Sequence, residues 1–80
     1  MKRETIEKKV IILFKRELGR KDVEISNTFE DLDIDSLDRD SVECLCEDLF
    51  DFAERIAVWD EFWRTGKTLN DLCNFIEARI

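Results

Sequence analysis

The sequence predicts an all-α fold, and three observations lead to this class. The chain has no proline and only two glycines, so few residues interrupt regular helix. Apolar residues recur at three- and four-residue spacing, the period of an amphipathic helix, and alternating strand patterns are scarce. Eighty residues, 44% of them hydrophobic, can build one small core. We therefore predict a single domain over residues 1–80, with three main helices and a short one before the last.

The first helix is expected near residues 3–18, followed by a long connection over residues 20–34. The apolar stripe of this helix comprises Ile6, Val10, Leu13 and Phe14. Gly19 is placed to end the helix as a C-terminal cap. The connection contains four spaced apolar residues that can hold it against the core: Val23, Ile25, Phe29 and Leu32. A long ordered loop in so small a domain is usually functional.

The second helix is expected to begin near Asp35 or Ser36. Asp35 is a good N-cap, and Asp38, three residues later, can complete a capping box. The expected apolar face comprises Val42, Leu45, Leu49 and Phe52, with Cys46, Phe50 and Ala53 beside them. The opposite face carries Asp40, Glu43, Glu47, Asp51 and Glu54. A face this wide suits the central helix of a bundle.

The last third of the chain predicts a short helix over residues 56–64 and a final helix after a break. Trp59 and Trp63 lie one turn apart in the short helix, and Thr65-Gly66-Lys67 interrupts the pattern. Thr68 can cap the final helix with Asp71 at the third position. The expected buried stripe comprises Leu69, Leu72, Cys73, Ile76 and Ile80.

The charge is unevenly distributed and indicates the kind of partner. The net charge is −7, but residues 1–21 carry +5 and residues 22–80 carry −12. An acidic body argues against nucleic acid and favours basic protein surfaces. The longest apolar run, residues 10–14, is too short to cross a membrane or to serve as a secretion signal. We expect a cytoplasmic, monomeric protein without a membrane partner.

Neither metal sites nor reactive thiols are indicated. The three cysteines are interpreted as free thiols, and the chain has no histidine to complete a zinc site. Asp31, Asp33 and Asp35 match the first three ligand positions of a calcium loop. Ser36 stands where that loop needs glycine, and Val42 stands where it needs glutamate. No specific metal is therefore predicted.

Ser36 is the main candidate for chemistry. A serine at a helix start has an exposed hydroxyl, and the helix N-terminus favours a phosphate placed there. With no histidine in the chain and no lysine nearby, a self-activated nucleophile is disfavoured. We therefore expect a non-catalytic chain whose serine is modified by another enzyme. The alternative is an ordinary N-cap serine.

Four segments together resemble the acyl carrier proteins. These segments are Asp35-Ser36-Leu37-Asp38, Phe29-Glu30-Asp31-Leu32 upstream, Glu47-Asp48 with Phe50 downstream, and Thr68-Leu69-Asn70-Asp71-Leu72. The resemblance covers essentially the whole chain. It implies an acyl-carrier-like four-helix bundle with a long first loop.

The resemblance also implies a cofactor and partners. Ser36 would carry 4′-phosphopantetheine, attached from coenzyme A by a phosphopantetheinyl transferase. Asp35 would help the metal site of the transferase, and Leu37 would be an exposed contact. Acyl-transferring and condensing enzymes with basic surfaces would read Asp38, Asp40, Glu43, Cys44, Glu47, Asp48 and Asp51. Carriers of this kind serve fatty acid, polyketide and related biosynthesis.

Several residues depart from the family pattern. The family usually has glycine at Asp33, an apolar residue at Asp40, glutamate at Ser41 and often methionine at Cys44. We infer a specialised carrier with dedicated enzymes. Trp59 and Trp63 are interpreted as core residues; the alternative is that they, or Phe62, border the acyl pocket or contact a partner. An unmodified acidic adaptor with the same fold is the competing function.

Overall fold

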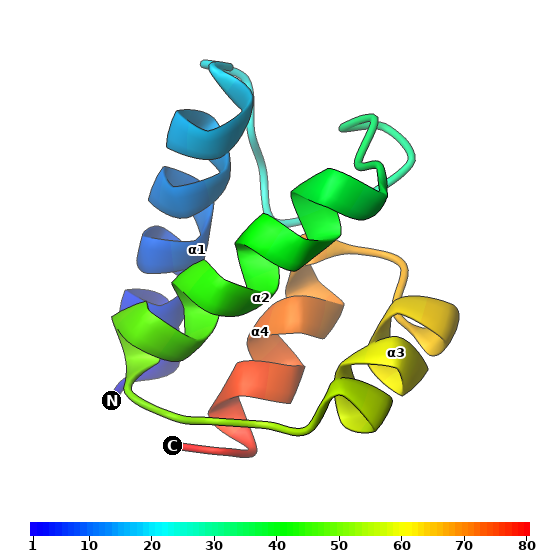
Figure 1. Cartoon of the computed structure of the whole chain (residues 1–80). Helices are drawn as coiled ribbons and strands as arrows, with labels where there is room; N and C mark the ends of the chain where they lie inside the picture. Colours follow the sequence, from blue (N-terminus) through cyan, green and yellow to red (C-terminus); the bar gives the residue numbers. More distant parts are fainter.

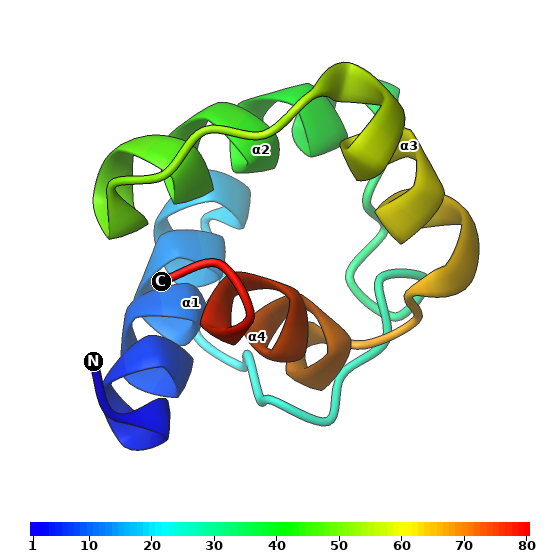
Figure 2. The same cartoon turned by 90° about the horizontal axis from the view of Figure 1, so that it is seen from below.

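The computed structural model describes residues 1–80 as four α-helices (Figure 1). They are α1 (Arg3–Leu18), α2 (Ser36–Phe50), α3 (Ile56–Thr65) and α4 (Leu69–Glu77). Helix α2 lies across α1 and α4, and α3 lies beside the end of α2 that carries its first residues (Figures 1 and 2). The only β contact is an isolated bridge between Thr28 and Thr68. The all-α prediction is confirmed, and none of the helices has the length and apolar character needed to span a bilayer.

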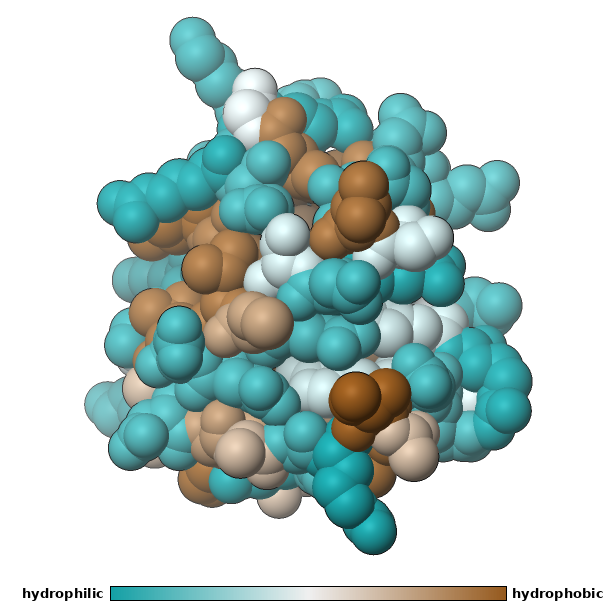
Figure 3. Space-filling model, viewed as in Figure 1, coloured by the Kyte–Doolittle hydropathy of each residue, from teal (hydrophilic) through white to brown (hydrophobic).

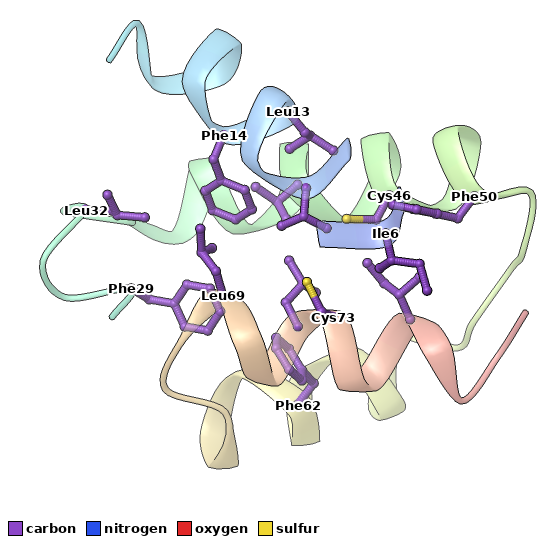
Figure 4. Close-up of a cluster of buried hydrophobic side chains, with 14 of the residues drawn as sticks. Ile6, Leu13, Phe14, Phe29, Leu32, Cys46, Phe50, Phe62, Leu69 and Cys73 are labelled. Atoms are coloured by element: carbon purple, nitrogen blue, oxygen red, sulfur yellow. The ribbon is translucent and has the colours of Figure 1, made fainter. Parts of the chain in front are cut away.

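One hydrophobic cluster of 16 buried residues joins the four helices and the α1–α2 connection. In Figure 4, Phe14 of α1 points toward Leu69 of α4, and Cys73 of α4 points toward the layer formed by α1 and α2. No charged or polar residue is buried in this cluster. Since the core draws on every element, the position of each helix depends on the others.

The long α1–α2 connection is held against the core, as the sequence predicts, and it is also hydrogen-bonded to the start of α4. Val23, Phe29 and Leu32 are buried. The Phe29 amide donates to the Lys67 carbonyl (2.9 Å), and the Leu69 amide donates to the Asn27 carbonyl (3.1 Å). These bonds fix the loop from both sides and thereby place the first residue of α2.

The apolar face of α2 is narrower than predicted. Its buried residues are Val42, Cys46 and Phe50, which are spaced by four. Leu45 and Leu49 are 38% and 42% exposed, so their assignment to the core was wrong. The helix also ends earlier than the pattern suggests, because Asp51 adopts a left-handed conformation with φ 55°.

The C-terminal helices also differ from expectation. Helix α3 has ten residues and α4 has nine, so α3 is not the shortest helix. Ile80 lies beyond the end of α4 and is 46% exposed, so it does not belong to the buried stripe. The capping box of α4 is present: the Thr68 side chain accepts from the Asp71 amide, and the Asp71 carboxylate accepts from the Thr68 amide.

The turn before α2 contains Asp33 at φ 54°, in the left-handed region. The turn therefore forms without the glycine that the acyl carrier family usually has here. A side chain with a Cβ carries a steric cost in this conformation, although Asp tolerates it better than most residues. No side-chain hydrogen bond of Asp33 offsets this cost in the structure.

Replacing Asp33 with glycine should therefore stabilise the protein, by about 1 kcal/mol. Urea denaturation measures the change in the free energy of unfolding. Asp33→Ala is the matched control, because it removes the same charge but keeps the Cβ. An equal gain in both variants would show that charge repulsion, and not the backbone, limits stability at this position.

Candidate functional site

Ser36 is the first residue of α2, and Asp35 is its N-cap. The Asp35 carboxylate accepts from the Asp38 amide (2.9 Å), and the Asp38 carboxylate accepts from the Asp35 amide (3.2 Å). The predicted capping box is thus confirmed. Ser36 is exposed, and its hydroxyl makes no hydrogen bond. Since Asp35 caps the helix, the interpretation of Ser36 as an ordinary N-cap serine was wrong.

A hollow of about 290 Å³, here called the Ser36 hollow, opens beside this serine between α2 and α3. Its lining contains a single apolar side chain and is otherwise charged or polar: Ser36, Arg39, Asp40, Glu43, Asp60, Trp63 and Arg64. The guanidinium of Arg39 lies 5.6 Å from the centroid of the Trp63 ring. A group attached to Ser36 would therefore meet charged and polar side chains and one indole.

Two carboxylates of α2 tie α3 to α2. The indole nitrogen of Trp63 donates to Glu43 (2.8 Å), and that of Trp59 donates to Glu47 (3.0 Å). Both glutamates are half-buried. Burial raises the pKa of Glu43, repulsion from Asp40 and other carboxylates adds to the rise, and the bond from Trp63 opposes it. The carboxylates of these two glutamates therefore already accept hydrogen bonds within the molecule.

The other residues expected to meet partners are distributed differently. Asp40, Cys44 and Asp48 are exposed and, being spaced by four, form one row along α2. Asp51 is exposed just beyond the last residue of α2, and Asp38 is half-buried in the capping box. Leu37 is 77% exposed. The structure thus gathers Asp40, Cys44 and Asp48 into one free row that begins near Ser36.

The two tryptophans play different structural parts. Trp59 is 1% exposed and packs as a core residue. Trp63 is half-buried, lies 5.0 Å from Phe29 between ring centroids, and borders the Ser36 hollow. Phe62 is buried beside them. Of the three aromatic residues considered from the sequence, Trp63 is the one that borders a hollow at the serine.

The structure shows few other groups suited to chemistry, as the thiols, the acidic residues and the surroundings of Ser36 indicate. Burial raises the pKa of the Cys46 thiol to about 12 and that of Cys73 to about 11, so both are poor nucleophiles at neutral pH. No group of three or more Cys, Asp or Glu residues is placed to hold a metal ion. No hydrogen bond joins the Ser36 hydroxyl to a carboxylate. The Ser36 hydroxyl is therefore exposed and has no hydrogen-bonded base beside it.

Sequence reasoning missed the Glu43–Trp63 and Glu47–Trp59 hydrogen bonds. These residues lie 20 and 12 positions apart, so helix periodicity does not reveal the pairs. One signal was present, because a buried indole N–H usually finds an acceptor and α2 offers a row of carboxylates.

Comparisons with family models, curated proteins and solved structures return no match for this chain.

The raised pKa of Glu43 predicts the effect of Glu43→Gln. Glu43 ionises less readily in the folded state than in the unfolded state. The resulting loss in the free energy of unfolding is absent below the ordinary pKa of 4.5 and grows as pH rises through the pKa of the folded state. Glutamine keeps an acceptor for Trp63 and cannot ionise. We expect Glu43→Gln to raise Tm at pH 7, with the gain vanishing well below pH 4.5, as followed by thermal denaturation across pH.

Glu43→Ala separates the hydrogen bond from the charge. It also removes the ionisable group, but it leaves the Trp63 N–H without its acceptor. We expect it to destabilise the protein by about 1 kcal/mol at pH 7. If Glu43→Ala were as stabilising as Glu43→Gln, the indole–carboxylate bond would contribute nothing to holding α3.

Proposed function

We propose that this chain is an acyl carrier protein that holds acyl intermediates on a 4′-phosphopantetheine arm attached to Ser36. The observation that carries the proposal is the state of this serine. It stands exposed at the first position of α2, its hydroxyl is unbonded, and the neighbouring Asp35 performs the capping. A serine freed from the structural role common at helix starts is available for modification. The Asp-Ser-Leu-Asp sequence around it supports the same interpretation.

The local electrostatics fit a phosphodiester at Ser36. The amides of Ser36 and Leu37 donate to no acceptor, whereas that of Asp38 is taken by Asp35. Unpaired amides at a helix N-terminus favour an anion. Arg39 and Arg64 in the Ser36 hollow add positive charge beside a largely acidic helix. These residues would hold the phosphate close to the helix start.

In the proposed modification, Ser36 Oγ attacks the β-phosphate of coenzyme A. The new phosphoester bond to Ser36 forms as the bond to 3′-phosphoadenosine 5′-phosphate breaks. The serine proton passes to a base of the transferase, since this chain provides none. The arm supplies a terminal thiol that carries acyl groups as thioesters. The chain itself is therefore a substrate and a carrier, not an enzyme.

The free surface of α2 supports recognition by basic partners. Leu37 gives a transferase an apolar contact, and Asp35 keeps one carboxylate oxygen outside the capping bond. The row of Asp40, Cys44 and Asp48, with Asp51 beyond it, faces the basic surfaces of acyl-transferring and condensing enzymes. Such charges mainly set the association rate and orientation. Because Asp40, Ser41 and Cys44 depart from the family pattern, we assign the carrier to a specialised fatty acid, polyketide or related pathway.

Modification of Ser36 is tested by intact mass. The purified protein is incubated with coenzyme A, magnesium and a broad-specificity phosphopantetheinyl transferase. We expect a gain of one phosphopantetheine on the wild type and none on Ser36→Ala. This variant is a clean control, because the cap is Asp35 and the serine makes no bond, so its Tm should be unchanged.

An unmodified acidic adaptor gives a different result. A folded wild-type protein that gains no mass in vitro is next isolated from its native host and weighed. A host protein that also lacks the arm would overturn the carrier proposal.

A further inference from the structure

An open groove between α1 and α2 gathers exposed apolar side chains from both helices. Its volume is about 540 Å³, and it is here called the α1–α2 groove. Ile12 is 51% exposed, Leu45 and Leu49 are partly exposed, and the buried Leu13 completes the apolar lining. Brown atoms gather over α1 and α2 in Figure 3. Neighbouring exposed apolar residues of this kind often mark an interaction surface.

The two walls of this groove carry opposite charges. Lys9 and Arg16 line it from α1, with one acidic residue, Glu17, at the far end of that wall. Asp48 lines it from α2. None of these four side chains forms an ion pair within the molecule. The groove therefore offers an apolar floor between a mainly basic wall and an acidic wall, and both walls are free to bind.

This distribution of charge selects one kind of occupant. The occupant must bring apolar side chains together with acidic charge over α1 and basic charge over α2. An anionic membrane would attract the α1 wall, but it would repel the α2 wall. A second copy of this chain satisfies both walls. A two-fold axis that runs along the groove sets the basic wall of each copy over the acidic wall of the other, so the contact is self-complementary.

The same axis predicts which charges meet. Glu17, near the end of α1, shares a hollow with Asp40 and Cys44 from the first half of α2. The start of α1 lies toward the end of α2 (Figures 1 and 2). Lys9 and Asp48 therefore lie toward the same end of the groove. Since rotation about the groove axis preserves position along it, Lys9 comes opposite Asp48 of the second copy, and symmetry makes this contact twice.

We propose that two copies of this chain associate through the α1–α2 groove as a weak, two-fold symmetric dimer. Ile12, Leu45 and Leu49 pack across the axis, and the basic wall of each copy pairs with the acidic wall of the other. This dimer replaces the monomer expected from the sequence, which assigned Leu45 and Leu49 to the core.

The dimer does not depend on the proposed carrier function. Ser36 and Leu37 do not line the groove, so the serine stays accessible in the dimer. Asp48 also belongs to the exposed row proposed above to face enzymes. The second copy and a bound enzyme therefore compete for this residue.

Sedimentation equilibrium of the purified full chain tests the association. A single small groove predicts a dissociation constant weaker than about 1 µM, so samples from about 5 µM to about 1 mM are compared. Two copies of net charge −7 repel each other. The measurement is therefore made at about 0.15 M salt, which screens the long-range repulsion. We expect the average mass to rise with concentration toward twice the mass of one chain.

Substitution of the apolar lining tests the location of the dimer. We expect Leu45→Asn to weaken association by about tenfold or more, because the leucine is lost from the contact of both copies. Ile56→Asn is the matched control, because it removes a large apolar side chain exposed on α3, outside the groove, and should leave the dimer intact. Circular dichroism checks that each variant is folded. If Leu45→Asn does not fold, Ile12→Asn on the exposed face of α1 provides the same test.

Reversal of charge tests how the two copies are arranged. Lys9→Glu and Asp48→Lys should each weaken the dimer by about tenfold or more, because each sets like charges opposite one another at two places. An equimolar mixture of the two variants should recover association, since a dimer with one copy of each has attractive pairs at both places. Neither side chain has a partner within the molecule, so both variants should keep the fold.

Each contrary result has a definite meaning. A mass of one chain at every concentration would overturn the dimer and leave the groove to a helix of another protein. A dimer that persists in a folded Leu45→Asn variant would lie on another surface. A dimer that both charge variants weaken, but that their mixture does not restore, would contradict the pairing of Lys9 with Asp48 across the axis. The mass gain at Ser36 is measured separately, so failure of the carrier proposal leaves these outcomes unchanged.

Discussion

The pairing of residues 25–29 with residues 67–70 is the constraint on which the rest of the structure depends. The Asn70 amide donates to the Ile25 carbonyl (3.0 Å), and neighbouring bonds join Asn27 to Leu69 and Phe29 to Lys67. These bonds hold a loop that has no helix of its own against the start of α4. Buried loop residues then anchor the turn that places Ser36. If the loop were hydrogen-bonded at only one end, the position of the first residue of α2 relative to α3 would not be fixed.

The residues on three sides of helix α2 make different contacts. One line of residues, Val42, Cys46 and Phe50, packs in the core. A second line, Glu43 and Glu47, accepts hydrogen bonds from the tryptophans of α3. The remaining surface carries exposed acidic residues together with Leu45 and Leu49, which are partly exposed. Since α2 is anchored on two sides, its free side keeps a fixed shape.

The sequence was most informative where local chemistry decides the structure. The bounds of α1, both capping boxes and the left-handed Gly19 follow from propensities and spacing over a few residues. It was least informative where distant elements compete for one surface. Leu45 and Leu49 have the correct spacing for the core, but α1 and α4 bury only the line through Cys46. Asp51 ends α2 in the left-handed conformation that glycine usually adopts, so the residue type did not predict the end of the helix. The position of Ser36 could be predicted, whereas its hollow depends on Trp63, 27 residues later.

The separation of charge affects how the molecule is oriented as it approaches a charged surface. Residues 1–21, mostly α1, carry +5, and the rest of the chain carries −12. Because α1 lies along one edge of a molecule only 28 Å across, the charges form a large permanent dipole moment (Figure 1). Near a charged surface, such a dipole experiences a torque within about a Debye length, 8–10 Å at physiological ionic strength. Rotation thus turns α1 away from a positive surface during approach, and part of the orientational search is over before contact.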